Sequence, residues 1–296
     1  MFSFEVFFKI FDTMILPVLT YGAEIWGFDE YQCLERIQFL ACRSFLGVSC
    51  NAPNVSVLGE CGRVPIFFHT ARRCVKYWCK LLNMPDHRYP KKCYNMLYNI
   101  SMSGVRFKPT WVCQVKNLLV RCNLKDVWDQ QEITNVNDFL AIFSDRLKTI
   151  LFIEWQSKVF TTDKLSSYRE FKFNLEPEKY LFCVKEYVHI QMLARLRCSS
   201  HWLRIESDRK YKVDRDDRLC LLCDEASVEN EYHFVLVCSF FDTWRKRFIP
   251  FYYYNPPSWR KFIDLMSSRD VNIIRCLAVF TFHALKVRKD IQEFDV

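Results

Sequence analysis

Three cysteines and one histidine in the last third of the sequence have the spacing of a metal site. Cys220 and Cys223 form the only Cys-x2-Cys pair in the chain, and His233 and Cys238 follow after nine and four intervening residues. Two thiolates at this spacing can reach one ion from a tight turn, and an imidazole and a third thiolate complete a tetrahedron. The spacing therefore predicts a structural Zn2+ held by Cys220, Cys223, His233 and Cys238.

The alternative is a set of reduced core cysteines beside an unrelated histidine. With 15 cysteines in 296 residues, a Cys-x2-Cys pair is expected roughly 0.8 times by chance. A histidine within a dozen residues and a further cysteine five positions later lower that expectation about a hundredfold. A site with four protein ligands has no position for water, so we expect it to stabilise a small local unit rather than to catalyse a reaction.

Basic residues interleaved with aromatic residues on both sides of this motif could contact nucleic acid. Lysine and arginine neutralise phosphates, and aromatic faces stack on unpaired bases. Residues 195–218 contain eight basic and five acidic side chains, so a solvated charged face is the alternative for that stretch. The candidate phosphate contacts are Arg204, Lys210, Lys212, Arg218, Arg245, Lys246 and Arg247.

Glycine is scarce, and its distribution points to a mainly α fold. The chain has six glycines, and none lies between residues 105 and 296. This absence disfavours phosphate loops rich in glycine, Rossmann turns and long series of tight hairpins. We therefore expect a multi-helix assembly with a small zinc module, of three cysteines and one histidine, near the C-terminus.

The cysteines, the charge and the hydrophobic runs restrict the cellular setting. Fifteen cysteines scattered through the chain are more typical of reduced core residues than of a disulfide scaffold. No run reaches the roughly 18 to 20 apolar residues of a membrane span, and the apolar start is read as an amphipathic helix rather than a signal peptide. We expect an intracellular protein of nucleus or cytoplasm, not secreted and without a membrane partner. The net charge of +8 permits a nucleic-acid partner without requiring one.

Periodic apolar residues predict most of the helices. Gly47 is expected to end the first clear helix, and Asn137, Ser258 and Asp270 are expected N-caps. Residues 50–64 are expected to form a loop because of Pro53 and their two glycines. The helices are expected to begin near residue 30, to follow Pro65, and to cover 111–122, 138–160, 177–197 and 271–289.

Several segments resemble LINE-type (non-LTR) retrotransposon reverse transcriptases, in the same order along the chain. Those of the second half resemble the zinc-binding module that ends many of these enzymes. Those of the first half resemble the region that follows the palm. The segments are FDTMILPVLTYGAEIWG (11–27), LER (34–36), LGV (46–48), GECGRVP (59–65), LARLR (193–197), HWLRIE (201–206), RLCLLC (218–223) and ENEYHF (229–234), with Cys238.

The resemblance implies a helical thumb-like, post-palm region over 1–84. Pro85, Pro90, Gly104 and Pro109 predict a linker over 85–109, and periodic apolar residues predict a helical connector over 110–197. A zinc-binding module over 198–248 and a C-terminal helical segment over 249–296 would follow. The only Asp-Asp pair, Asp216-Asp217, has no apolar strand before it and is read as a solvated loop. A reverse transcriptase needs paired carboxylates that hold two metal ions, so no enzymatic activity is expected.

The resulting expectation is a non-catalytic, zinc-stabilised fragment that binds RNA or DNA with low specificity through basic surfaces. The alternative is a helical interaction or relic module with a purely structural zinc and no nucleic-acid binding. The oligomeric state is left open.

Overall fold

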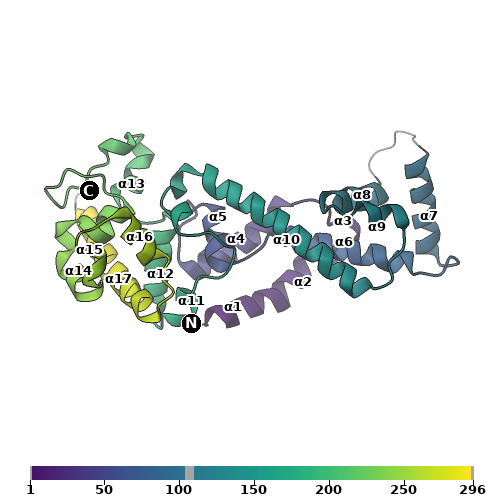
Figure 1. The fold of residues 1–296 in the computed structure, drawn as a ribbon, viewed down its shortest axis with the longest axis horizontal. Coiled ribbons are helices and arrows are strands. Elements are labelled where there is room, and N and C mark those ends of the chain that lie inside the picture. The colour runs from purple at the N-terminus through teal and green to yellow at the C-terminus, as the bar shows by residue number, and fades with distance from the viewer. Residues whose placement is uncertain (1, 104–109, 295–296) are drawn as a thin grey trace. The chain divides into compact units, whose positions relative to one another are not determined.

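The structure, a computed structural model, describes residues 2–103 and 110–294, with side chains as far as residue 291. Within these ranges the chain forms seventeen α-helices and no strand (Figure 1). Two isolated bridges, Leu219 with Val228 and Tyr254 with Pro257, are the only β-type pairings there. The expected mainly α fold is therefore confirmed.

The α-helices follow one another with short connections. The first nine are α1 (Phe4–Ile10), α2 (Leu16–Leu19), α3 (Ala23–Trp26), α4 (Gln32–Leu46), α5 (Asn54–Cys61), α6 (Ile66–Leu82), α7 (Tyr89–Met102), α8 (Trp111–Arg121) and α9 (Lys125–Gln130). The others are α10 (Val136–Thr161), α11 (Tyr180–Cys183), α12 (Tyr187–Arg197), α13 (Arg204–Ser207), α14 (Asp242–Phe248), α15 (Phe251–Tyr254), α16 (Trp259–Met266) and α17 (Val271–Phe294).

Shorter 3-10 and π turns connect several of these helices. The two π turns are η1 (Phe11–Ile15) and η6 (His233–Val237). The 3-10 turns are η2 (Asp163–Leu165), η3 (Tyr168–Glu170), η4 (Asp208–Tyr211), η5 (Arg215–Asp217) and η7 (Ser239–Phe241). Among the described residues, no helix combines the length and apolar character that a membrane crossing needs.

The chain divides into two compact units. Unit 1 comprises Met1–Phe8, Phe39–Arg63 and Trp155–Val296, and unit 2 comprises Lys9–Gln38 and Val64–Glu154. The chain passes from one unit to the other inside α1, α4 and α10 and in the loop after α5. Each unit is assembled from separate parts of the chain.

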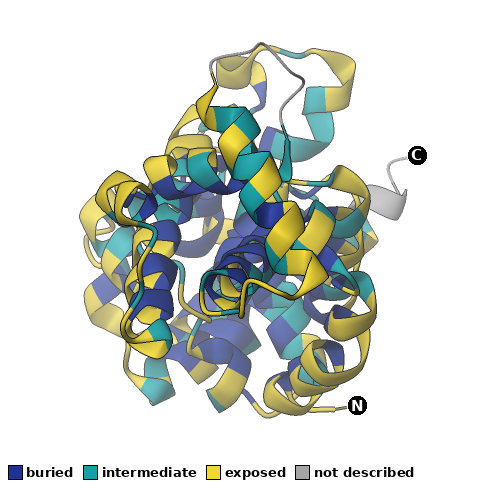
Figure 2. Cartoon of the chain, turned by 90° about the vertical axis from the view of Figure 1, so that its right-hand side faces the viewer, coloured by how far each residue is buried: buried dark blue, intermediate teal, exposed yellow. Residues whose placement is uncertain are grey.

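Unit 2 is built around the apolar face of α6. Trp78 is fully buried and stacks on Trp128 of α9 with ring centroids 5.8 Å apart. Its indole N–H donates to Tyr94 Oη of α7 at 3.0 Å. The opposite face of α6 carries Arg72, Lys76 and Lys80, all exposed. Figure 2 shows the same pattern, with buried residues on the inner sides of the helices and exposed ones outside.

Unit 1 is organised by the long helix α17, which packs along α12 and also contacts α11 and α14. Phe280 of α17 is fully buried and lies 5.8 Å, between ring centroids, from Phe234 of η6. Phe234 also meets Phe241 at 4.8 Å. Aromatic contacts of this kind add to the apolar area that each ring buries, so α17 forms part of the core on which the metal motif rests.

Charged residues are also buried in unit 1. Arg197 Nε donates to Glu60 Oε2 at 2.8 Å, and Arg197 Nη2 lies 3.0 Å from Glu178 Oε2. Lys172 Nζ is 2.6 Å from Glu178 Oε1. Two cations thus face two carboxylates, and this balance is what makes their burial tolerable.

Two segments expected to be irregular are helical. Residues Asn54–Cys61 form α5 inside the expected loop. Gly59 lies within this helix at a position that needs glycine, because a Cβ there would stand 2.5 Å from Tyr168 Oη. Gly62 ends the helix at φ +61°. The two glycines therefore mark a close approach and a helix end.

The expected linker over 85–109 contains α7 (Tyr89–Met102). Pro90 lies in its first turn, where a missing N–H removes no intrahelical hydrogen bond. The remaining signals for a linker, Gly104 and Pro109, lie outside the described residues.

One expected helix is interrupted and one expected cap is displaced. The segment 177–197 contains α11 and α12, separated where Val184 adopts φ −83° and ψ 126°. At α10, Asn135 rather than Asn137 accepts the first N–H groups. Ser258 and Asp270 cap α16 and α17 as expected, and Gly47 has the left-handed φ of +63° that suits a helix end.

Candidate metal centre

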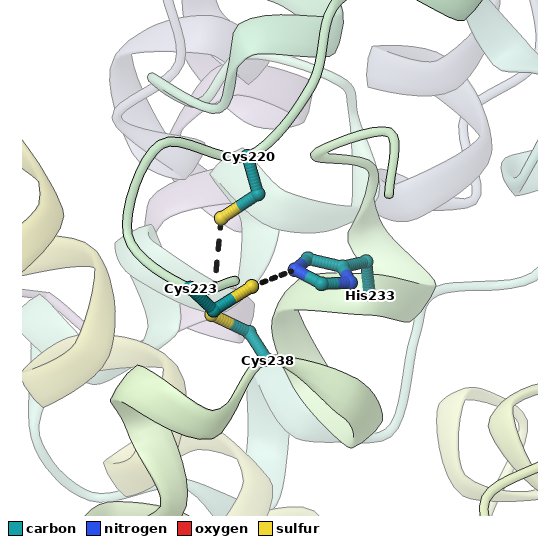
Figure 3. Close-up of side chains that lie close together, drawn as sticks. All are labelled: Cys220, Cys223, His233 and Cys238. Carbon is teal, nitrogen blue, oxygen red and sulfur yellow. Dashed lines mark hydrogen bonds between the residues drawn. The ribbon is translucent and has the colours of Figure 1, made fainter. Parts of the chain in front are cut away.

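The four residues of the sequence motif converge in the structure (Figure 3). Their ligand atoms all lie within 4.8 Å of one another. Cys220 Sγ is 3.9 Å from Cys238 Sγ, and Cys223 Sγ is 3.4 Å from His233 Nε2. Residues up to 18 positions apart thus present three sulfurs and one imidazole nitrogen to a common point.

A short paired loop positions the first two cysteines. The bridge between Leu219 and Val228 closes this loop, with Cys220 N donating to Ser227 O at 2.8 Å. The backbone then turns so that Cys223 returns to the same side (Figure 3). Cys220 is buried, and Cys223 is partly exposed.

Backbone amides donate to all three sulfurs. The N–H of Leu222 donates to Cys220, that of Glu225 to Cys223 and that of Phe240 to Cys238. Each donor follows its cysteine by two residues, and N–H donors of this kind stabilise a thiolate. The local backbone is therefore arranged to accept negative charge at each sulfur.

The three thiols also perturb one another. The hydrogen bond from Cys238 lowers the pKa of Cys220 well below its ordinary value. The same bond raises the pKa of Cys238, since Cys238 holds the shared proton. Burial raises the pKa of Cys223, and the charge of Cys220 adds to that effect. Clustered thiols cannot all ionise without a compensating positive charge, which a divalent cation supplies.

A π turn presents the histidine and the third cysteine. In η6, Cys238 N donates to His233 O at 2.8 Å, and Asn230 Oδ1 accepts from His233 N at 2.8 Å. His233 is 2% exposed, with Nε2 directed at Cys223. Its Nδ1 has no hydrogen-bond partner within the described chain. The ring is therefore held by its backbone and by packing.

Arg245 supports η6 and is not a surface residue. Its guanidinium donates to Val235 O at 2.9 Å and to Cys238 O at 2.7 Å, and it pairs with Asp242. The side chain is only 2% exposed. These bonds fix carbonyls within and just after the π turn, where Cys238 O also accepts from Phe241 N at 3.2 Å. The structure therefore removes Arg245 from the predicted phosphate contacts.

Arg218 is likewise buried. Its guanidinium donates to Val213 O at 3.0 and 2.7 Å and to Ile205 O at 2.7 Å. These bonds join Arg218, which lies just before the metal motif, to the loop at Val213 and to α13 at Ile205. Arg218 therefore lies mostly below the surface, not on a solvated charged face.

The other five predicted phosphate contacts lie at or near the surface. Lys210, Lys212 and Arg247 are exposed, and Lys246 is exposed but pairs with Asp242 at 3.2 Å. Arg204 is half-buried and pairs with Asp208 at 2.6 Å. Three of the seven residues are thus exposed cations without a carboxylate partner in the described chain.

Acidic groups within and before the motif differ in their surroundings. Glu231 is buried, with Oε1 3.0 Å from His201 Nε2 and Oε2 accepting from Ser167 Oγ at 2.8 Å. Burial raises the pKa of Glu231, but the hydrogen bond and the charge of His201 lower it by a larger amount. The net pKa of Glu231 therefore lies below its usual value. Asp216 and Asp217 lie exposed in η5, as expected for a solvated loop.

The residue set derived from the sequence omits Arg169, Arg209 and Arg215. These three side chains line one pocket together with Arg218. Arg169 lies 46 positions before Arg215 in the sequence, so spacing alone gives no sign that they meet. The basic stretch from Arg204 to Arg218 was the available signal for the other two.

The comparisons with known proteins add no relative. No family model, no curated protein and no solved structure matches the chain. The functional argument therefore rests on the geometry of the cluster, which could hold a metal ion, and on the charged residues near it in the sequence.

Proposed function

We propose that this chain is a non-catalytic, zinc-stabilised portion of a LINE-type reverse transcriptase that binds RNA or DNA through basic surfaces. The observation that carries the proposal is the convergence of Cys220, Cys223, His233 and Cys238 within 4.8 Å. The zinc holds the loop and the π turn together, and the nearby cations contact phosphates.

The distances support zinc as the ion. A tetrahedral zinc with sulfur ligands at about 2.3 Å and a nitrogen ligand at about 2.0 Å separates two sulfurs by about 3.8 Å. It separates sulfur and nitrogen by about 3.5 Å. The corresponding distances are 3.9 Å for Cys220 and Cys238 and 3.4 Å for Cys223 and His233. Three thiolates and an imidazole are also a donor set that favours zinc over harder cations.

A structural role follows from the number of protein ligands. Four protein donors complete a tetrahedral shell and leave no open position for a water or substrate. Three of the four residues are buried. The metal therefore contributes folding free energy and no Lewis-acid chemistry.

The nucleic-acid part of the proposal rests on exposed cations near the metal loop. Lys210 and Lys212 flank Tyr211, an exposed ring, and Lys210 Nζ lies 4.5 Å from its centroid. Arg247 extends from α14 beside Phe248. Cations beside an accessible aromatic ring such as Tyr211 suit a flexible strand, because phosphates are neutralised and bases have a surface for stacking.

Two measurements test the proposal. Elemental analysis of protein purified under reducing conditions without chelators should find about one zinc per chain. Fluorescence anisotropy with single-stranded and duplex probes should give affinities that fall steeply with salt, because bound phosphates release counterions. Substitution K210Q/K212Q/R247Q should weaken binding, and the matched neutralisation K125Q/K185Q/R275Q should not.

Each part of the proposal can fail separately. Less than about half a zinc per chain contradicts the structural metal. Absence of binding at low salt, or binding indifferent to salt, contradicts the nucleic-acid role. Zinc without nucleic-acid binding, together with capture of a protein partner, would favour the alternative of a helical interaction module.

A further inference from the structure

A second site lies in unit 1, where the segment after α10 meets the loop before the metal motif. It is a pocket of about 270 Å³. Four arginines and one aspartate supply all the charges of its lining, so the pocket is strongly cationic. The lining residues are Asp163, Ser166, Arg169, Arg209, Arg215 and Arg218.

Arg218 is a buried cation without a nearby carboxylate. It is 8% exposed, and its donors go to the carbonyls of Val213 and Ile205. No carboxylate lies within ion-pair distance of Arg218 in the described chain. Carbonyls satisfy its N–H groups but leave its charge uncompensated, and an uncompensated buried charge is costly. An anion in the pocket would offset that cost.

The other arginines keep donors for a ligand. Arg209 Nη2 pairs with Glu206 Oε1 at 3.1 Å, but its buried Nε has no hydrogen-bond partner within residues 2–103 and 110–291. Arg215 Nη2 donates to Ser166 Oγ at 3.1 Å and has no carboxylate partner in that part of the chain. The pocket therefore offers N–H groups whose acceptors are not all supplied by the protein.

Acidic groups near the pocket reduce the positive charge without cancelling it. Arg169 Nε lies 3.5 Å from Glu170 Oε1. Glu206 is shared between Arg209 and Lys164, the latter at 3.1 Å. Asp163 lies in the lining itself. Among the lining residues and their ion-pair partners, Lys164 included, five cations stand against three carboxylates.

We propose that this pocket binds a phosphate group. Phosphate offers several acceptor oxygens and no obligatory donor, which matches converging guanidinium forks. The phosphate comes either from a nucleic-acid strand or from free phosphate. The strand form rests on the proposed function, and the free form does not.

The first experiment uses inorganic phosphate as the probe and thermal unfolding of the full chain as the readout. Wild type should be stabilised progressively by millimolar phosphate at constant ionic strength, because a ligand that binds only the folded state raises its stability. R209Q/R215Q should lose most of that shift, and K185Q/R275Q should keep it. Equal shifts in R209Q/R215Q and wild type, or no shift in either, would overturn the proposal.

A single substitution guards against misfolding. Arg215 is exposed, so R215Q should leave zinc content and circular dichroism unchanged. R215Q should still lower the phosphate-induced shift, and R215K should keep part of it because the charge remains. If R209Q/R215Q does not fold, R215Q decides the test. A phosphate-induced rise in melting temperature that is as large in R215Q as in wild type would count against the pocket.

The second experiment distinguishes the two sources of phosphate. Anisotropy titrations compare one single-stranded oligonucleotide on wild type, R209Q/R215Q and K185Q/R275Q at several salt concentrations. If a strand occupies the pocket, R209Q/R215Q should bind about tenfold more weakly, with a salt slope smaller by about 1. Strand binding unchanged in R209Q/R215Q would overturn the strand form.

The outcomes separate this pocket from the proposed function. If wild type binds no oligonucleotide but shows a phosphate-induced shift that requires Arg209 and Arg215, the proposed function fails. The pocket then stands as a site for free phosphate. If wild type binds oligonucleotide and R209Q/R215Q changes neither measurement, the pocket fails and the proposed function stands.

Discussion

Glu229 and Arg288 are 59 positions apart and form a buried bidentate ion pair. Arg288 Nε lies 2.6 Å from Glu229 Oε1, and Nη2 lies 3.0 Å from Oε2. Glu229 also accepts from Arg204 N at 2.9 Å, and its backbone N–H donates to Arg218 O. The loop that carries Cys220 and Cys223 is thereby joined to α17, the last helix.

This ion pair should behave as one coupled unit. R288M leaves the Glu229 carboxylate buried without its main partner, so unfolding free energy should fall by about 3 kcal/mol. E229M/R288M should recover much of that loss, because neither charge remains buried alone. Urea unfolding of zinc-saturated protein measures the cycle. Losses that simply add would contradict the coupling.

Removal of one metal ligand should remove the metal. C223S replaces a thiolate by a weaker donor, so zinc should fall from about one per chain to near zero. The protein should then lose the response of its melting temperature to chelators. C276S is the control, since Cys276 lies outside the cluster. Full zinc content in C223S would exclude Cys223 as a ligand.

Arg245 should act on the metal without touching it. R245Q removes donors to the carbonyls of Val235 and Cys238, which hold the π turn that presents His233. We expect a loss of about 3 kcal/mol in stability and a 10- to 100-fold loss of zinc affinity. Competition with a chromogenic chelator measures the affinity. R247Q, on the exposed side of the same helix, should change neither property.

Two glycines with the same backbone conformation should respond differently to alanine. Gly62 and Gly22 have φ of +61° and +66°, so either substitution carries a strain of about 1 kcal/mol. A Cβ at Gly62 would overlap the backbone nitrogen of Pro177, whereas at Gly22 the nearest atom is 3.7 Å away. G62A should therefore cost several times more than G22A in thermal unfolding. Equal costs would mean that Pro177 moves aside freely.

Glu178 should contribute stability that depends on pH. Burial raises the pKa of Glu178, but the charges of Arg197 and Lys172 lower it by a larger amount. The net pKa of Glu178 therefore lies below the ordinary 4.5. A carboxyl group with a lowered pKa stabilises the folded state above its unfolded pKa, and the contribution is lost as pH falls through the folded value.

The measurement compares E178Q with wild type. At pH 7 the variant should be less stable by about 3 kcal/mol, and the difference should shrink as pH falls below 4.5. Taking the difference cancels the acid-induced release of metal that affects both proteins. A gap that stays constant from about pH 7 to about pH 3.5 would exclude this contribution.

The metal cluster and the strongly periodic helices were predictable because both signals are local. The four ligands lie within 18 positions, and a turn geometry that brings them together depends on few other residues. The stripe of α6, which includes Val75 and Trp78, is buried as the 3.6-residue period predicts. Local pattern was sufficient in both cases.

The failures came from residues whose role depends on distant partners. Gly59 lies inside a helix, where the close approach of Tyr168 and Trp155 and not a loop requires glycine. Arginine is usually a surface residue, but Arg245 is buried because it donates to a carbonyl of η6 about ten positions earlier in the sequence. Arg169 and Arg215 are far apart in the sequence, but the fold places both in the lining of one pocket. No periodicity or spacing carries these relationships.

The dependence of the metal loop on α17 has a consequence for synthesis of the chain on the ribosome. All four ligands are translated 50 or more residues before Arg288. The proposed metal site is therefore complete in a nascent chain before Phe280 and Arg288 are added to enclose the loop. An ion bound at this stage would not yet be enclosed by α17. Zinc should therefore leave the ribosome-bound chain faster, while α17 is still in the exit tunnel, than it leaves the completed protein.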